Sequence, residues 1–377
     1  MSKQTKKHNL IIVAFYASMK SGCDYATQTI DILGKRHSVI GFALGEPITW
    51  RDIFSFGDKK RVVEEYKRYT IFRPFFVIPG QRLVFIKQMN LFVNAVLLRT
   101  FISIYHTQEK KYFWFFEPFF IPTMLRVFSS YITIFDCVDY FLTVQRPFLS
   151  HAISAIQRAT HGFVNSYTLK KQLSRHRTDI SVVPLGFAYD LFCHAQRVKE
   201  KKGTKQVCIG YIGGIDERLD YKLLYNTARS LPTAIFVFVG TNYFSYNTAP
   251  RFFKLLYSLQ NVTFIGEVSK LKIPAMIQSF DICLIPYDCK QLFNLYCFPM
   301  KTLEYFYYGK PVFATDIQEL RRFNQELIII HSYTELVHKI KYVMKKGWPQ
   351  NIQKKQITHA TRNSWEKKIH AIEQHIF

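Results

Sequence analysis

Residues 281–316 read DICLIPYDCKQLFNLYCFPMKTLEYFYYGKPVFATD, and no other stretch of the chain carries as much structural information. The apolar run at 281–286 predicts a buried strand that ends at a proline, and a loop follows it. A helix is expected from about Met300 to Gly309, because glycine commonly ends a helix. Pro311 then opens the next strand, so the order is strand, loop, helix, strand, which is typical of a parallel α/β sheet.

Two charged side chains lie near the start of this predicted helix. The N-terminus of a helix after the carboxyl end of a strand can bind an anion, since it offers unsatisfied N–H groups and a positive dipole. Lys301 is unfavourable beside that dipole, so we expect it to face a negative group. Glu304 lies one turn further in, where a carboxylate can accept hydrogen bonds from a sugar diol. The alternative is a solvated Lys301–Glu304 surface pair.

Short apolar strands alternate with helical segments throughout the chain, which predicts an α/β fold of two doubly wound domains that face a cleft. The polar segment 196–206 is the best linker candidate, and the tail from about Lys354 is expected to form one long helix. Strands are expected at 10–17, 38–44, 112–116, 131–137, 162–165, 180–184, 207–212, 234–240, 262–265, 282–286, 311–314 and 327–330.

The composition limits the classes of partner. Of 377 residues, 51 are Lys or Arg and 27 are Asp or Glu, a net charge of +24. Such a surplus predicts an anionic partner, either nucleic acid, a phosphorylated substrate or an acidic membrane surface. No nucleic-acid-binding signature is present, so we expect no nucleic acid. The seven scattered cysteines without CxxC, and the lack of a signal peptide or membrane-spanning run, favour a cytoplasmic protein that is soluble or peripheral.

The pattern P-x-K-x-x-E-Y-x-x-x-G-K-P-V-x-x-T at 299–315 resembles the donor-binding segment of GT-B glycosyltransferases of the glycosyl transferases group 1 family, in particular the teichuronic-acid-type enzymes of bacteria. The resemblance implies two Rossmann-like domains. It also implies that Glu304 holds the ribose hydroxyls of a nucleotide sugar. The loop before it, with Phe298, Pro299 and Met300, would present backbone amides to the diphosphate and the sugar.

The segment VCIGYIGGIDERLDYKLL at 207–224 is similar to the first βα turn of the family's C-terminal domain. There a basic residue after the glycines binds the donor diphosphate, and the resemblance assigns this role to Arg218, whose guanidinium can hold phosphate bidentately. Gly213 and Gly214 would let the ligand approach the backbone. The alternative for Arg218 is an ion pair with Asp216 or Asp220.

Weaker similarities to the same family follow in the expected order. The segment FIGEV resembles a strand end that contacts the base, which implies donor contacts for Glu267 and Val268. Many retaining members have a second Glu eight residues before the position of Glu304, and Tyr296 stands there, so the sugar and the stereochemistry stay open. The implied domains are 1–190 for the acceptor, 191–360 for the nucleotide sugar, and 361–377 for a helix that crosses back to the first domain.

The segment FDCVDYF at 135–141 places two carboxylates where a strand ends, Asp136 and Asp139. An inverting transferase needs a carboxylate to deprotonate the acceptor hydroxyl, and either residue is a candidate base. The alternative is a helix N-cap and a structural pair. Ser21 and Gly22, after the first strand, resemble the family's acceptor-side loop.

We expect neither a metal nor another cofactor. The chain has no D-x-D motif and no HExxH or H-x-x-x-H spacing. Lys301 and Arg218 would then stabilise the leaving diphosphate.

The segment 83–102 predicts a helix with a wide apolar surface and a narrow polar stripe at Lys87, Asn90 and Asn94. We expect this helix to be core, packed on the sheet. Together with the basic residues at 59–87, it could instead dip into an anionic membrane surface.

The predicted function is transfer of a sugar from a UDP- or GDP-linked donor to a saccharide or lipid-linked acceptor in cell-surface polysaccharide biosynthesis, at the cytoplasmic membrane face. Two alternatives stay open. One is a nucleotide-sugar epimerase on the same fold, and the other is a sugar-binding or assembly subunit without activity.

Overall fold

The chain divides into two compact α/β units. The first comprises Met1–Pro184 and Lys368–Phe377, and the second comprises Leu185–Lys367, so the division falls inside the last helix. Residues 196–205 of the expected linker lie outside the described residues. The computed structural model describes residues 9–16, 25–54, 61–80, 82–119, 121–143, 148–195, 206–245 and 247–377.

The first unit is built on an eight-stranded sheet with the order β3-β4-β2-β1-β5-β6-β7-β8. Every neighbouring pair is parallel except β3 and β4. Strand β1 (Asn9–Phe15) is buried along nearly its whole length, as expected for a parallel strand covered on both faces. The other strands are β2 (Ser38–Ala43), β3 (Val63–Glu65), β4 (Thr70–Phe72), β5 (Lys110–Phe115), β6 (Ile132–Cys137), β7 (His161–Val164) and β8 (Ile180–Val182).

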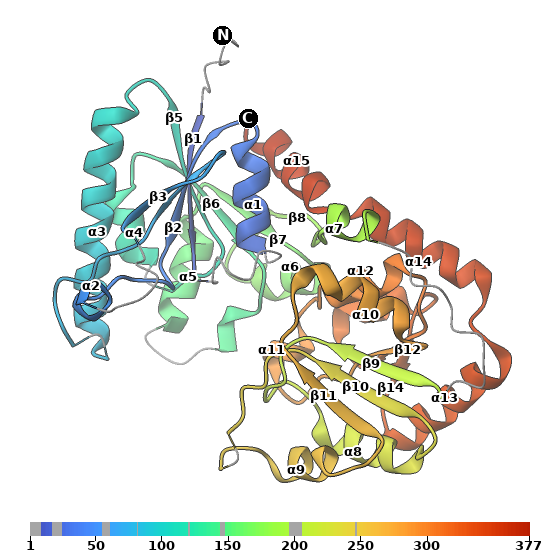
Figure 1. The fold of residues 1–377 in the computed structure, drawn as a ribbon. Coiled ribbons are helices and arrows are strands. Elements are labelled where there is room, and N and C mark those ends of the chain that lie inside the picture. The colour runs from blue at the N-terminus through green and yellow to red at the C-terminus, as the bar shows by residue number, and fades with distance from the viewer. Residues whose placement is uncertain are drawn as a thin grey trace. The chain divides into compact units, whose positions relative to one another are not determined.

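Helices cover both faces of this sheet. Helices α3 and α4 lie on one face, and α1 and the C-terminal part of α15 lie on the other (Figure 1). The helices are α1 (Tyr25–Gly34), α2 (Trp50–Phe54), α3 (Val84–Tyr105), α4 (Ile121–Val127), α5 (Phe148–Arg158), α6 (Tyr167–Leu173) and α15 (Trp365–Ile376), with a 3₁₀ turn at Phe141–Thr143.

The second unit has a six-stranded parallel sheet with the order β11-β10-β9-β12-β13-β14. Its strands are β9 (Cys208–Ile212), β10 (Ile235–Val239), β11 (Val262–Gly266), β12 (Ile282–Ile285), β13 (Val312–Thr315) and β14 (Ile328–Ile330). Its helices are α7 (Tyr189–Cys193), α8 (Tyr221–Ser230), α9 (Arg251–Tyr257), α10 (Ile273–Ser279), α11 (Leu292–Leu295), α12 (Lys301–Tyr307), α13 (Tyr333–Lys346) and α14 (Gln350–Arg362), with 3₁₀ turns at Lys270–Lys272 and Gln318–Phe323. Helices α8, α9 and α13 form one layer, and α10, α12 and α14 form the other (Figure 1).

The prediction of one long C-terminal helix is wrong, because the chain breaks between α14 and α15. The backbone there pairs with Phe187, whose N–H donates to the carbonyl of Asn363 and whose carbonyl accepts from the N–H of Trp365. A Cβ atom at Gly186 would lie 2.6 Å from the backbone of Trp365, so glycine is required at this close approach. The tail therefore forms two separate helices, α14 and α15.

The helix expected at 83–102 forms as α3, and the prediction that it is core packed on the sheet holds only for its inner side, where Leu91, Ala95, Leu98 and Ile102 are buried. Asn90 and Asn94 are buried and face inward, and most of the large apolar side chains on the helix are exposed. Within the described ranges, no helix is both long enough and apolar enough to span a bilayer. Helix α3 is therefore a surface helix whose outer face is apolar.

Candidate active site

The carboxyl ends of β9 and β10 are joined by two closely packed glycines. Gly213 has φ +146° and Gly240 has φ +147°, a conformation that side chains rarely adopt. A Cβ atom on Gly240 would lie 2.0 Å from the carbonyl oxygen of Gly213. Gly240 was not singled out in the sequence, although it ends an apolar strand. The two glycines therefore let the turns after β9 and β10 pack closely against each other at this edge of the sheet.

Lys301 reaches back from the first turn of α12 to this glycine turn. Its ammonium nitrogen Nζ donates to the hydroxyl of Tyr287 at 2.5 Å and lies 3.4 Å from that of Tyr211. It also lies 4.7 Å from each ring centre, and a Cβ atom at Gly213 would be 2.9 Å from it. Burial raises the pKa of Tyr211, so its hydroxyl stays neutral. No described carboxylate lies within ion-pair distance of Lys301, which leaves its charge available to an anion.

Arg218 approaches the same turn from the other side. Its guanidinium lies 5.7 Å from the ring centre of Tyr287, and a Cβ atom at Gly214 would be 3.3 Å from its Nη2 atom. It pairs with Asp216 at 2.9 Å, so part of the predicted alternative is realised. Asp220 does not pair with it and instead caps α8 by accepting from the N–H of Leu223. The structure therefore brings the two predicted cations together around Tyr287.

Glu304 lies one turn along α12, and its side chain is half-buried. Burial raises the pKa of its carboxyl group, and the charges of Lys301 and Lys270 oppose that rise. In the part of the chain that the structure describes, no group donates a hydrogen bond to this carboxylate and no ion pair joins it to Lys301. The alternative of a Lys301–Glu304 surface pair is therefore wrong, and the carboxylate keeps its capacity to accept.

Two further predicted donor residues lie at the same edge of the sheet. Glu267 is exposed directly after β11 and accepts a hydrogen bond from the hydroxyl of Thr241 at 3.2 Å. Val268 beside it is half-buried. Because Thr241 follows Gly240, these residues continue the row that begins at Gly213.

The loop before α12 offers fewer free backbone N–H groups to an anion than the sequence predicted. The side chain of Phe298 is buried and stacks on Phe323 at 5.9 Å between ring centres, and Pro299 is buried as well. The N–H groups of Thr302 and Leu303 already donate to the carbonyls of Pro299 and Met300. Only backbone groups ahead of these two remain for an anion, so the side chain of Lys301 supplies most of the positive charge.

In the first unit, the structure assigns Asp136 a role other than the predicted one. This β6 side chain has no exposed surface, and it forms an ion pair with Lys368 of α15 at 2.7 Å. Lys368 is itself 1% exposed. A side chain enclosed in this way does not reach an acceptor, so the assignment of Asp136 as a base is corrected to a structural ion pair. Asp139, after the strand, is partly exposed and stays a candidate.

A carboxylate that the sequence analysis missed lies beside Asp139. Glu117 follows β5, the neighbour of β6, and one of its oxygens accepts a hydrogen bond from the hydroxyl of Tyr25. The other, Oε2, is buried and has no hydrogen-bond partner among the described residues. Burial, with a smaller contribution from the charge of Asp139, raises the pKa of Glu117 to about 7. Its sequence signal is a single acidic residue in the aromatic run FWFFEPFF at a strand end.

The raised pKa of Glu117 predicts a pH-dependent stability. Its folded-state pKa lies above the unfolded value of 4.5, so its contribution is fully present below pH 4.5 and is lost as the pH rises through about 7. Glu117→Gln removes the charge that must be buried at high pH. We therefore expect the variant to gain thermal stability relative to the wild type between pH 5 and pH 8. A difference in melting temperature that stays constant over this range would contradict the raised pKa.

Ser21 and Gly22, predicted on the acceptor side, lie outside the described residues. Within the residues that the structure describes, no group of three or more His, Cys, Asp or Glu side chains could hold a metal ion.

Residues 206–346, which carry Lys301, Arg218 and Glu304, match the family model described as Glycosyl transferases group 1. This part of the chain is similar to the members of that family. Over 254 residues the chain is 25% identical to TuaH of Bacillus subtilis (strain 168), which is named as a teichuronic acid biosynthesis glycosyltransferase. The match covers 62% of this chain and 62% of that relative, less than two thirds of its length.

Solved structures show the fold of the whole chain. Sucrose-phosphate synthase from Thermosynechococcus elongatus aligns with a TM-score of 0.75 at 14% identity, over 97% of this chain and 98% of that one. A glycosyltransferase from Rickettsia africae ESF-5 gives 0.70 at 15% identity, over 98% of both chains. Anabaena Alr3699/HepE, in complex with UDP and glucose, gives 0.69 at 13% identity, over 98% of this chain and 99% of that one. The fold is therefore GT-B, as the sequence predicted.

Proposed function

We propose that the protein is a glycosyltransferase that takes a sugar from a UDP- or GDP-linked donor and transfers it to a saccharide or lipid-linked acceptor in polysaccharide biosynthesis. The observation that carries the proposal is the convergence of Lys301 and Arg218 on Tyr287 beside the glycine turn at Gly213, with Glu304 one helical turn away. Two cations and an unused carboxylate suit a nucleoside diphosphate, because the cations match the phosphates and the carboxylate matches the ribose.

The leaving group explains why the cations are needed. When the bond between the anomeric carbon and the diphosphate oxygen breaks, the electron pair stays on the diphosphate, whose negative charge grows. Fixed positive groups at that point stabilise the transition state more than the ground state. Lys301 is held by two tyrosine hydroxyls and Arg218 by Asp216, so neither cation has to reorganise during the reaction.

The acceptor oxygen forms the new bond to the anomeric carbon, and its proton must leave. We assign the proton to the carboxylates at the carboxyl edge of the first sheet, Glu117 in the first place and Asp139 beside it. A base is most effective when its pKa lies near the working pH, and the pKa of Glu117 is about 7. A protein base of this kind corresponds to inversion at the anomeric carbon. Tyr296, at the position of the second family Glu, is consistent with that outcome.

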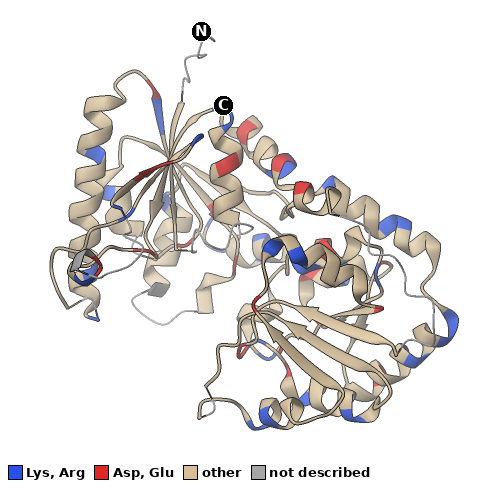
Figure 2. Ribbon diagram, viewed as in Figure 1, with Lys and Arg blue, Asp and Glu red and all other residues tan. Residues whose placement is uncertain are grey.

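The proposal also places the enzyme at the cytoplasmic face of a membrane, as a peripheral protein. The net charge of +24 supports this part, since anionic lipids attract basic surfaces. Figure 2 shows Lys and Arg residues on the elements of both units.

Glu304→Gln tests the donor site. The substitution keeps the shape of the side chain and removes its charge, and charge-assisted hydrogen bonds contribute about 1.5–3 kcal/mol. We expect UDP or GDP, whichever the wild type binds, to bind roughly ten- to a hundredfold more weakly in calorimetry. Glu366→Gln, an exposed glutamate of the second unit, is the matched control and should bind as the wild type. Unchanged affinity in folded Glu304→Gln would reject the donor site.

Arg218→Ala tests, in the same experiment, whether Arg218 contacts the phosphates or the nucleoside. Because Arg218 is assigned to the diphosphate, its loss should weaken the nucleoside diphosphate more than the monophosphate. Arg229→Ala, an exposed arginine at the end of α8, is the control.

Incubation with labelled nucleotide sugars then distinguishes the classes of protein. Slow donor hydrolysis indicates a transferase, interconversion an epimerase, and binding without turnover an inactive subunit.

A further inference from the structure

The inner face of helix α3 buries two asparagines beside the apolar side chains of Leu91, Ala95, Leu98 and Ile102. Asn90 and Asn94 are 1% and 2% exposed, and their side-chain amides exchange hydrogen bonds of 2.8–2.9 Å with the backbone of Phe75 and Ile78. These contacts hold the helix on the segment 75–78 through polar groups. The inner face of α3 is therefore held in place by amide hydrogen bonds as well as by buried apolar side chains, which normally decide how a helix packs.

The outward face of α3 is a mostly apolar stripe, interrupted by the exposed Thr100 and Ser103, along a helix about 33 Å long. Its exposed members recur every three or four residues, so they share one face. Phe85 is 69% exposed, Leu97 56% and Tyr105 68%, although side chains of this kind are usually buried. Soluble monomers rarely expose apolar patches of this extent. The apolar stripe comprises Val84, Phe85, Met89, Phe92, Val93, Val96, Leu97, Phe101, Ile104 and Tyr105.

Basic residues border the apolar stripe, and α3 contains no Asp or Glu (Figure 2). Arg82 precedes the helix and Lys110 follows it, and both are exposed. Glu109, the acidic residue next to the C-terminal end of the stripe, pairs with His106 at 3.0 Å. An apolar face with a basic rim matches the surface of an anionic bilayer, in which acyl chains lie beneath phosphate groups.

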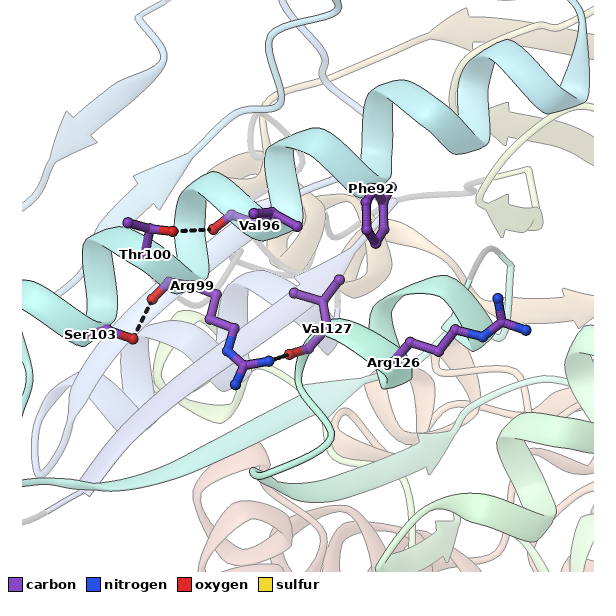
Figure 3. A pocket seen from close by; sticks show the side chains of 7 residues that line it. All are labelled: Phe92, Val96, Arg99, Thr100, Ser103, Arg126 and Val127. Carbon is purple, nitrogen blue, oxygen red and sulfur yellow. Dashed lines mark hydrogen bonds between the residues drawn. The ribbon is translucent and has the colours of Figure 1, made fainter.

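A groove of about 480 Å³ opens between α3 and α4 at this stripe. Phe92, Val96 and Val127 form its apolar wall, and in Figure 3 they lie between the side chains of Arg99 and Arg126. Arg99 donates one hydrogen bond to the carbonyl of Val127, which fixes its guanidinium at the groove. An apolar wall with a guanidinium group on either side suits a phospholipid, whose phosphate would meet the cations while its chains follow the wall.

We propose that α3 docks the protein on an anionic phospholipid bilayer, with the apolar stripe inserted among the lipids and Arg99 and Arg126 in contact with lipid phosphates. This inference deepens the membrane part of the proposed function and does not depend on the donor site. The helix would lie in the plane of the interface, because its inner face is occupied by the contacts of Asn90 and Asn94.

Co-sedimentation with vesicles of phosphatidylcholine, with and without phosphatidylglycerol, tests the proposal. The full chain should bind the anionic vesicles, and binding should fall as salt is raised, since exposed charges are screened within about 8–10 Å. Leu97→Gln and Phe101→Gln should each lower partitioning roughly tenfold, because each removes a side chain from the bilayer. Arg126→Gln should lower it about fivefold on anionic vesicles and leave neutral vesicles unaffected.

Matched variants on the second unit distinguish binding through this surface from non-specific binding to vesicles. Leu271→Gln replaces a leucine that is 77% exposed, and Arg251→Gln an exposed arginine, and both should bind vesicles as the wild type does. Binding of nucleoside diphosphate should be unchanged in every variant, so loss of docking and loss of the donor site are distinguishable. The proposal is overturned if the wild type ignores anionic vesicles, or if Leu97→Gln binds them normally. It is also overturned if Leu97→Gln changes self-association instead, since a second copy would then cover the stripe.

Discussion

Glu117→Gln is expected to lower turnover by roughly 10²–10⁴-fold, the usual contribution of a general base. Gln is similar in shape and can still accept the hydrogen bond from Tyr25, so the surroundings of the side chain should persist. Nucleotide affinity should not change, because Glu117 belongs to the first unit and the donor residues belong to the second. The measurement is the initial rate of transfer or donor hydrolysis at saturating nucleotide sugar, with calorimetry of the nucleotide on the same samples.

The pH profile distinguishes a base from a residue that only supports the fold. A base acts in its ionised form, so turnover of the wild type should rise as the pH increases through about 7. Glu117→Gln should lose this rise. Asp139→Asn should move it to lower pH, because the negative charge of Asp139 raises the pKa of Glu117 and its removal lowers that pKa.

Other outcomes assign the chemistry differently. If Asp139→Asn abolishes turnover while Glu117→Gln retains it, Asp139 is the base, as the sequence predicted. If both variants turn over at near-normal rates, no protein base acts at this edge of the sheet. A retaining mechanism would then follow, despite Tyr296 at the position of the second family Glu.

The fold could be predicted because parallel strands leave a strong local signal. Strands such as β1 and β12 are continuous apolar runs that end at turn residues, so every central strand of both sheets lies close to its expected position. The short pair β3 and β4 was missed, because three-residue strands at the edge of a sheet are partly exposed and show no apolar run. The break between α14 and α15 depends on pairing with Phe187, a contact nearly 180 residues away that no local pattern records.

The second-unit site was predictable to the extent that a motif keeps its residues together. Lys301 and Arg218 are 83 positions apart in the sequence, and both contact Tyr287, as expected if they serve one ligand. The tyrosine hydroxyls that hold Lys301 were not predicted, since tyrosine is common in this chain. For helix α3, the prediction from the sequence was incomplete. Its wide apolar surface was recognised, but the pattern does not reveal which apolar residues face inward. The hydrogen bonds of Asn90 and Asn94 to the segment 75–78 help to set the inward face.

The ion pair of Asp136 could not be predicted from the local sequence either, because its partner Lys368 lies 232 positions away. Sequence places Asp136 at a strand end, where a catalytic carboxylate is plausible, and only the return of the C-terminal helix shows that it is enclosed. The distinction between a base and a structural ion pair has a measurable consequence. Removing a base costs activity and leaves stability, whereas removing one member of a buried ion pair costs stability first.

Lys368→Met is therefore expected to destabilise the first unit by about 3–5 kcal/mol, because it leaves the carboxylate of Asp136 buried without its cation. Lys367→Met, the adjacent and exposed lysine, should change stability by no more than about 0.5 kcal/mol. The double variant Asp136→Leu with Lys368→Met replaces both charges by apolar groups and should recover most of the loss. Urea unfolding of the wild type, Asp136→Leu, Lys368→Met and the double variant gives the coupling between the two side chains.

Turnover of the double variant decides the role of Asp136. If the double variant is folded and still transfers sugar, Asp136 has no chemical part in the reaction, and the pair serves to hold α15 on β6 together with the contacts of Glu373 to Arg36 and His37. If it is folded but inactive while Glu117→Gln is active, the buried carboxylate acts in catalysis and its assignment as a structural pair is wrong. A stability unchanged by Lys368→Met would also contradict that assignment, since an enclosed carboxylate does not lose its cation without cost.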